Sequence, residues 1–325
     1  MVHQTSGPVL LAIAALAAIV APFVMPVNIA TEILIFGIFA MSANLLIGVA
    51  GLYSFGQAAF FGVGGYVAGY CFKNTELPLF AGLALATVGG AVVAALVGSI
   101  SIRRSGIYFM MLTFAFNQMI YYVAYSWRSV TGGEDGLGGI KRPALSVPLW
   151  GNIDLGVQTN FYTLSALMFL LSFVLLYRMT RSPLGLVLEA ARQNPRRTAS
   201  IGFSVYRTQL IAFVVAGAMA GLAGALFALL YRIMPIDAIS WASSGTVVFM
   251  VVIGGMSSML GPVMGAAIFI WLQGFFSLYW SRWPLLFGVF IILVVLFLRG
   301  GLVELFERVR GLFGKPVSRS NEVRT

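Results

Sequence analysis

The side chains that could do chemistry in this 325-residue sequence are neutral amides and hydroxyls set in or beside apolar segments. Ser54 and Gln57 flank Gly56 in one such segment, and Asn117 and Gln118 are neighbours in another. Amides can line a passage through an apolar environment without the desolvation cost of a charge. The alternative for each residue is a hydrogen bond between helices. Because glycine-rich, irregular backbone can face a cavity, we predict that these five residues border a passage.

The sequence lacks the residue types that a catalytic site or a metal site would need. The sequence has one histidine, His3, and one cysteine, Cys71, so it cannot build a histidine-based triad, a cysteine metal cluster or a disulfide. The string closest to a phosphate-binding loop, GLFGKP from Gly311 to Pro316, has the wrong spacing and a proline after the lysine. We therefore predict no catalytic residue, no metal site and no cofactor bound by this chain.

The composition predicts the elements that must position the polar side chains. Hydrophobic residues make up 60% of the chain and charged residues only 9%, whereas soluble domains carry about 25% charged residues. We therefore predict an all-α polytopic membrane protein with ten transmembrane helices. Glycines flank the third and eighth, which we expect to be broken or re-entrant. The predicted spans are 9–25, 29–48, 57–72, 79–100, 106–125, 161–177, 210–231, 243–255, 262–280 and 283–298.

The distribution of basic residues predicts the orientation. Most of the 20 lysines and arginines fall on the side that carries residues 178–209 and the C-terminal tail, which marks that side as cytoplasmic. We predict a multi-pass protein of a bacterial cytoplasmic (inner) membrane with both termini in the cytoplasm. The net charge of +10 reflects this bias and contact with membrane lipid, so no nucleic-acid partner is needed to explain it.

We expect residues 1–300 to form a single transmembrane domain and residues 301–325 to form an amphipathic tail on the inner membrane surface. The longest outer loop, about 126–160, contains the string TGGEDGL with Glu134 and Asp135. This loop is either a solvated connector or a docking surface for a soluble partner.

The polar stretch from Arg178 to Gln209 cannot cross a bilayer, because it carries six arginines and one glutamate. Leu184–Arg192 can be helical, Pro195 can start a second helix, and Gly202 can end it. A helix, a turn and a second helix on the membrane surface would fit a groove on a partner protein. The alternative is that the arginines bind anionic lipid headgroups.

Small residues recur at helical spacing in several predicted spans. The pairs are Gly65 and Gly69, Gly217 and Gly221, Ala220 and Gly224, and Gly261 and Gly265. Such pairs let helix backbones approach closely in lipid. They serve packing within the chain or a face for a second membrane subunit.

Two segments carry distinctive motifs: Gly51–Tyr66 reads GLYSFGQAAFFGVGGY, and Glu189-Ala190-Ala191 is followed by Gly202. The first resembles the G-x-x-S-x-G-H/Q-A-A-F-F-G segment, and the second resembles the coupling loop, of the permease subunits of ABC importers for branched-chain amino acids. Further matches, in order, are Ser105–Phe116 followed by TGGEDGL, then Ile201–Ala228 and Ile253–Ala267. The resemblance covers most of Met41–Leu302 and is greatest to the M-type subunit, the LivM family.

The resemblance implies a complex and a mechanism. The M-type subunit pairs with a related H-type permease subunit above two ABC ATPase subunits, which bind ATP and Mg²⁺, and a periplasmic or extracellular substrate-binding protein delivers the substrate. Closure of the ATPases would be transmitted by the coupling loop and would switch the passage from one side to the other. Glu189, Ala190, Ala191, Arg192, Asn194 and Gly202 would then seat in the ATPase. Glu134 and Asp135 would meet the binding protein.

Other functions remain open on the sequence. An importer of urea or short amides has similar permeases. A secondary carrier would work alone, but a proton-coupled one needs a deep ionisable residue, and Glu32, near an outer end, is the one carboxylate within the predicted spans. A passive pore leaves the basic stretch at 178–209 unexplained.

Overall fold

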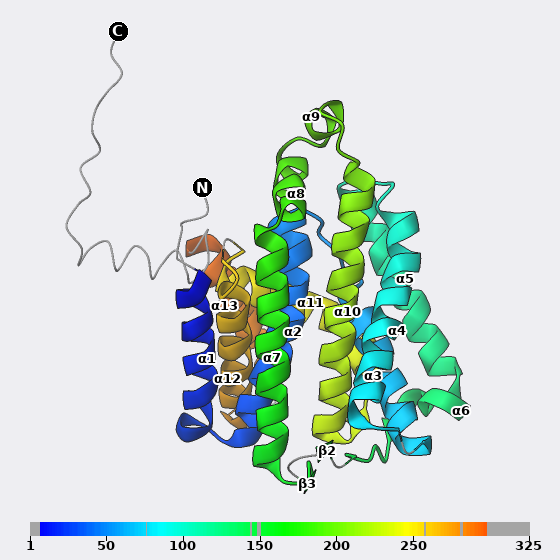
Figure 1. Ribbon diagram of the computed structural model, residues 1–325, viewed down its shortest axis with the longest axis vertical. Coiled ribbons are helices and arrows are strands. Elements are labelled where there is room, and N and C mark those ends of the chain that lie inside the picture. The colour runs from blue at the N-terminus through cyan, green and yellow to red at the C-terminus, as the bar shows by residue number, and fades with distance from the viewer. Residues whose placement is uncertain are drawn as a thin grey trace, which may run out of the picture.

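The apolar segments fold as helices, since backbone groups within a membrane must be satisfied inside their own segment. The computed structural model describes residues 7–75, 77–143, 145–147, 151–256, 258–279 and 282–297. Its long helices are α1 (Gly7–Val24), α2 (Val27–Asn44), α3 (Gln57–Asn74), α4 (Leu79–Ser101), α5 (Ile107–Ser126), α7 (Gln158–Arg181), α10 (Val205–Tyr231), α11 (Trp241–Gly254), α12 (Gly261–Tyr279) and α13 (Trp283–Phe297). They form a bundle with α8 and α9 projecting from one end (Figure 1).

Each segment predicted to span the membrane is helical, with ends that agree to within a few residues. Within the described part of the chain, six helices are long and apolar enough to cross a membrane: α2 with its C-terminal extension to Ala50, α4, α5, α7, α10 and α12. The chain is therefore a multi-pass membrane protein, and the residues that the structure describes are helical apart from loops and four very short strands. Two shorter apolar helices, α1 and α11, add to these six, and the count of ten spans stays a prediction.

The third and eighth predicted spans are not broken helices, and a re-entrant course for them stays a prediction. Both α3 and α11 are continuous, and the irregular backbone lies before α3 and after α11. After α2 the chain continues as a π-helix, η1 (Leu45–Ala50), which ends at Gly51 in a left-handed conformation with φ of 72°. The non-helical residues 51–56 follow. The glycines inside α3 serve close packing instead.

Helix α10 packs against α3 and α4 at backbone distance. A Cβ atom added at Gly224 would lie 1.8 Å from the carbonyl oxygen of Phe61 in α3, and one at Gly64 would lie 2.2 Å from that of Gly221. On the other side, a Cβ at Gly90 in α4 would lie 2.4 Å from the carbonyl oxygen of Gly217. These predicted small-residue pairs therefore serve packing within the chain.

Helices α11 and α12 form a second closely packed pair. A Cβ at Gly265 would lie 1.8 Å from the carbonyl oxygen of Met250, and one at Gly254 would lie 1.8 Å from that of Gly261. Both α10 and α12 also contact α2, so α2 lies between the two packed groups. Because of this central position, most residues of α2 are buried.

Short elements close the end of the bundle opposite α8 and α9 (Figure 1). They are α6 (Arg128–Thr131), η2 (Gly133–Asp135), β1 (Leu137–Gly138), β2 (Leu145–Val147), β3 (Gly151–Ile153), β4 (Ile233–Met234) and η3 (Ile236–Ile239). Strand β1 pairs antiparallel with β4, with Leu137 opposite Met234, and β2 pairs with β3 as a hairpin. At the projecting end, α8 spans Pro183–Gln193 and α9 spans Pro195–Ser200. The predicted tail at 301–325 lies outside the described residues.

A buried polar cluster connected to the projecting helices

The non-helical turn before α3 holds the first of the predicted passage residues. Ser54 is buried, and its Oγ accepts a hydrogen bond of 3.2 Å from the amide of Gly56. The neighbouring amide of Phe55 donates to Oγ1 of Thr113, a buried residue of α5, at 3.2 Å. The turn is therefore held in place by hydroxyl groups rather than by a regular backbone ladder.

Asn117 of α5 is hydrogen-bonded to two further elements, η3 and α11. Its Nδ2 donates to the carbonyl oxygen of Ile239 in η3 at 2.9 Å, and its Oδ1 lies 3.5 Å from Oγ of Ser244 in α11. The same Ser244 hydroxyl accepts a 3.0 Å hydrogen bond from the amide of Ala58, in the first turn of α3. A side chain from α11 thus satisfies one of the unpaired N–H groups at the start of α3.

Two members of this cluster were missed by the sequence reasoning. Thr113 and Ser244 are single hydroxyls in apolar helices, where such residues usually bond to their own helix backbone. A usable signal was the spacing of Thr113 and Asn117, which are four residues apart and so share one face of α5.

Gln57 lies in the same region and has no hydrogen-bond partner within the described part of the chain. Its side chain is 1% exposed, and both its Nε2 and its Oε1 are unpaired there. The half-buried Gln118 also has an unpaired Oε1, and no hydrogen bond joins it to the cluster. A buried unpaired amide costs about 1–3 kcal/mol, so a role in solute passage would explain why Gln57 is kept polar.

We expect Gln57→Leu to raise stability and lower transport. The substitution removes two unsatisfied polar atoms without a large change of volume, so the thermal midpoint of the purified chain should stay level or rise, in line with a gain of about 1 kcal/mol. Solute uptake should fall several-fold if the amide borders the passage. Melting by intrinsic fluorescence and uptake in vesicles measure the two effects, and a stabilised variant with full uptake would assign Gln57 to packing alone.

Gly56 and Gly62 lie near the start of α3 and differ in what a larger side chain would meet. A Cβ at Gly56 would meet the carbonyl oxygen of Thr113 at 3.4 Å, next to the polar cluster. Gly62 lies inside α3, and a Cβ there would come within 2.2 Å of the Ile239 side chain. Gly62 is therefore a packing position and not a bend that lines a cavity.

The projecting helices α8 and α9 lie where two helices were predicted, and α8 is one residue longer at each end than Leu184–Arg192. A proline starts each helix, Pro183 in α8 and Pro195 in α9. Asn194 caps α9, since its Oδ1 accepts a 3.0 Å hydrogen bond from the amide of Arg197. Gly202 follows α9 with φ of 93°, a left-handed conformation that favours glycine.

The residues that resemble a coupling loop lie on both faces of this helix pair. Glu189, Ala190, Asn194 and Gly202 are exposed, and a partner could reach them. Ala191 is buried together with Leu188, so it packs α8 onto the rest of the chain. Among the described residues, the structure thus provides an exposed surface on α8 and α9 and a fixed attachment beneath it.

Arg192 connects α8 directly to the π-helix. Its Nη1 donates a hydrogen bond to the carbonyl oxygen of Gly48 in η1. Its side-chain stem covers Gly51, where an added Cβ would lie 2.7 Å from Cγ of Arg192. Gly51 in turn opens the turn that leads to Ser54 and Gln57. The projecting helix pair is therefore in physical contact with the segment that carries the buried polar cluster.

The predicted docking residues at the opposite end sit on an ordered platform. Glu134 and Asp135 form most of η2 and are exposed. Thr131 holds the platform, since its Oγ1 donates to backbone carbonyls of Ala124 and Trp127 and accepts from the amide of Gly133 at 3.2 Å. The segment from Arg128 to Gly138 is thus folded onto the bundle rather than being a loose connector.

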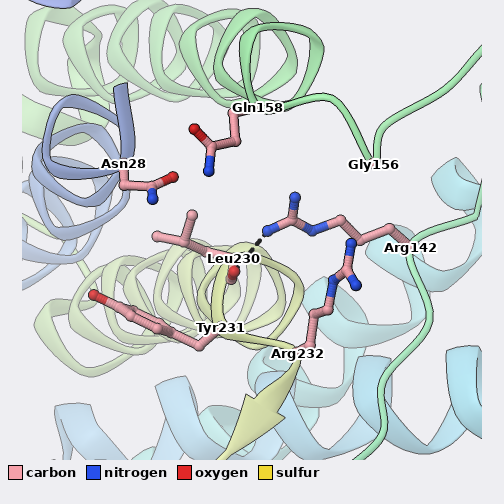
Figure 2. Close-up of a pocket in the computed structure, with 7 residues that line it drawn as sticks. All are labelled: Asn28, Arg142, Gly156, Gln158, Leu230, Tyr231 and Arg232. Carbon is pink, nitrogen blue, oxygen red and sulfur yellow. Dashed lines mark hydrogen bonds between the residues drawn. The ribbon is translucent and has the colours of Figure 1, made fainter. Parts of the chain in front are cut away.

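A cavity of about 250 Å³ at this end is organised by Arg142 (Figure 2). The guanidinium donates to the carbonyl oxygens of Leu229 and Leu230 at 2.7 and 2.6 Å, at the C-terminal end of α10, where a cation is favourable. It also lies 4.5 Å from the ring centre of Phe161. Burial, and then the nearby Arg232, lower the pKa of Arg142. This arginine ties the segment after β1 to the end of α10.

These features define a multi-pass helical membrane protein with a neutral polar interior and an exposed helix pair connected to it. A family model described as "Branched-chain amino acid transport system / permease component" matches residues 25–298. The chain belongs to this permease family, as its motifs predicted.

Individual relatives agree with the family assignment. The chain is 28% identical over 262 residues to the "High-affinity branched-chain amino acid transport system permease protein LivM" of Salmonella typhimurium, and 28% identical over 264 residues to the LivM protein of Escherichia coli. Each match covers 75% of this chain and 62% of the relative, so the chain spans less than two thirds of the length of these relatives. A "Probable branched-chain amino acid transport permease protein LivH" of Methanocaldococcus jannaschii is 27% identical over 100 residues, 30% of this chain and 29% of that protein. No solved structure matches.

Proposed function

We propose that this chain is the M-type permease subunit of an ABC importer for branched-chain or other hydrophobic amino acids. It would pair with an H-type permease subunit and work with two ATPase subunits, which bind ATP and Mg²⁺, and with a soluble substrate-binding protein. The family and its relatives support transport of this class of substrate. The observation that carries the mechanism is the contact of Arg192 in α8 with Gly48 in the π-helix.

The contact suggests how a force outside the membrane reaches the passage. Closure of the ATPase dimer on ATP would press on the exposed face of α8 and α9, where Glu189 and Ala190 lie. Arg192 would carry the displacement to η1, because its hydrogen bond and its packing on Gly51 connect the two elements. A π-helix and a non-helical turn can change backbone conformation at lower cost than an α-helix. The polar cluster around Gln57 would then open to one side at a time.

The remaining sequence predictions belong to the same proposal. In this proposal α8, α9 and both termini lie in the cytoplasm. Ten helices span the bacterial inner membrane. Glu134 and Asp135 then face outward on their ordered platform, where a substrate-binding protein could dock.

A mild-detergent pull-down of the tagged chain from its native membrane tests the proposal. Mass spectrometry should recover a second permease subunit and two ATPase subunits, and a vesicle preparation of that complex should take up leucine only with ATP and binding protein. Recovery of the chain alone, with uptake in liposomes that lack an ATPase, would contradict the proposal and favour a secondary carrier.

We expect Glu189→Lys to release the ATPase while the chain stays in the membrane. Glu189 is exposed on α8, so the substitution reverses a charge at the proposed contact without disturbing the packing beneath it. The ATPase recovered in the pull-down and ATP-driven uptake should both fall by about tenfold or more, a change that corresponds to 1.4 kcal/mol of interaction. Wild-type recovery of the ATPase together with normal uptake would remove Glu189 from the interface.

A further inference from the structure

A second cavity, of about 440 Å³, lies between α2, α10, α11 and α12. Its volume is within the range of roughly 300–1,000 Å³ that is common for small-molecule sites. Five polar residues contribute to its lining: Glu32, Tyr231, Ser243, Thr246 and Gln273. In the sequence, Glu32 stands out only as a carboxylate near the outer end of a predicted span. The structure places it in the wall of a cavity.

Aromatic side chains form the apolar part of this cavity. Phe36 and Phe227 line it with their ring centres 5.9 Å apart in an edge-to-face arrangement. The Phe227 ring also lies 4.8 Å from the Tyr231 ring in a tilted arrangement. The Phe61 ring contacts both phenylalanines, with its centre 6.2 Å from that of Phe36 and 5.4 Å from that of Phe227. Since these rings hold one another in place, the apolar wall is formed before any ligand enters.

Glu32 is half-buried in α2, and its polar environment is incomplete. The Tyr231 side chain lines the same cavity and is the polar group that acts on its carboxyl group. No lysine or arginine in the described ranges forms an ion pair with it. A carboxylate on a membrane-spanning helix is costly without a cationic partner, and such residues mark ligand or ion pathways. A ligand with a positive charge would supply the missing partner.

We propose that this cavity is a transient binding site for the transported amino acid, with the Glu32 carboxylate receiving its α-ammonium group. The aliphatic side chain of the ligand packs against Phe36 and Phe227, and the Tyr231 hydroxyl holds the Glu32 carboxylate in position. A carboxylate beside an aromatic wall favours a ligand that carries a primary ammonium group next to a small apolar group. The choice of an amino acid rests on the proposed function, but the recognition of the ammonium group does not.

Cysteine protection on the purified full chain tests this site directly. The variant Thr246→Cys, in a Cys71→Ser background, places one thiol in the cavity wall, and methyl methanethiosulfonate is a small neutral reagent that would modify it. We expect leucine to slow this modification by about tenfold at roughly ten times its Kd, because the reagent needs the empty cavity. Isopentylamine, which is leucine without the carboxylate, should protect as well. Isocaproate, which keeps the carboxylate and lacks the ammonium, should not protect.

Substitution of Glu32 provides the second part of the test. Glu32→Gln should abolish protection by leucine and isopentylamine and leave the unprotected rate unchanged. Asp154→Asn, a matched change of an exposed carboxylate outside the cavity lining, should keep full protection. Equal protection by isocaproate, protection that survives Glu32→Gln, or no protection by any compound would each overturn the site. If Glu32→Gln does not fold, the three compounds still decide the question on the chain that keeps Glu32.

The outcome of this assay is separate from that of the pull-down. The protection assay uses neither an ATPase nor a binding protein, so its failure leaves the importer proposal intact. Recovery of the chain without ATPases would overturn the importer, whereas protection in the same preparation would keep the ammonium site.

Discussion

Gly224→Ala should destabilise the protein more than any other single methyl addition proposed for it. The new Cβ would sit 1.8 Å from the carbonyl oxygen of Phe61, which is backbone and cannot rotate away. Helices α3 and α10 would have to separate along their length, and overpacking of this kind costs about 3 kcal/mol or more. The amount of folded chain after detergent extraction, together with its melting temperature, measures the loss.

The matched control for this substitution is Gly245→Ala. Gly245 also lies within an apolar helix, α11, but an added Cβ there meets nothing within 4 Å. Alanine is the better helix former by about 1 kcal/mol, so this variant should be as stable as the unmodified chain or more so. Similar melting temperatures for the two variants would show that α3 and α10 can move apart at little cost.

Arg192→Ala should abolish coupling without releasing the ATPase. The substitution removes the hydrogen bond to the Gly48 carbonyl and the cover over Gly51, so motion of α8 no longer reaches η1. A hydrogen bond to a charged donor contributes about 1.5–3 kcal/mol, and loss of that linkage corresponds to a fall of roughly tenfold or more in ATP-driven uptake. The ATPase should be recovered in normal amount, which separates this variant from Glu189→Lys.

Arg104→Ala is the control for the change of charge. Arg104 is exposed after α4, on the side predicted to be cytoplasmic, and its removal lowers the net charge by the same amount. Uptake should then be close to that of the unmodified chain. An equal fall in both variants would attribute the effect to net charge, whereas partial recovery in Arg192→Lys would support the contact itself.

The parts of the fold that depend on local sequence could be predicted. Apolar segments of membrane length predicted the positions of the long helices, and the predicted helix Leu184–Arg192 agrees with α8 to within one residue at each end. Pro195 and Gly202 predicted the start of α9 and the turn after it, because proline and glycine act on their own backbone. The exposure of Glu189 followed from the polar character of its segment.

The contacts that connect distant segments could not be predicted. Arg192 and Gly48 are 144 residues apart, and no local pattern pairs an arginine with a backbone carbonyl. The π-helix Leu45–Ala50 reads as a continuation of α2, since its residues are uniformly apolar. The cavity at Glu32 needs four helices from separate parts of the chain, so the sequence showed only one isolated carboxylate.

The glycine contacts also determine which parts of the molecule can serve as a fixed reference for motion. Helices α3, α4 and α10 are locked at backbone distance, as are α11 and α12, so each group should behave as one rigid body. The hydrogen bonds of Ser244 with Ala58 and of Asn117 with Ile239 cross between α3, α5, η3 and α11, and such bonds can exchange partners in a way that interlocked backbones cannot. Spin labels within one rigid body should therefore keep a constant separation through the transport cycle, and labels on α3 and α11 should report the change.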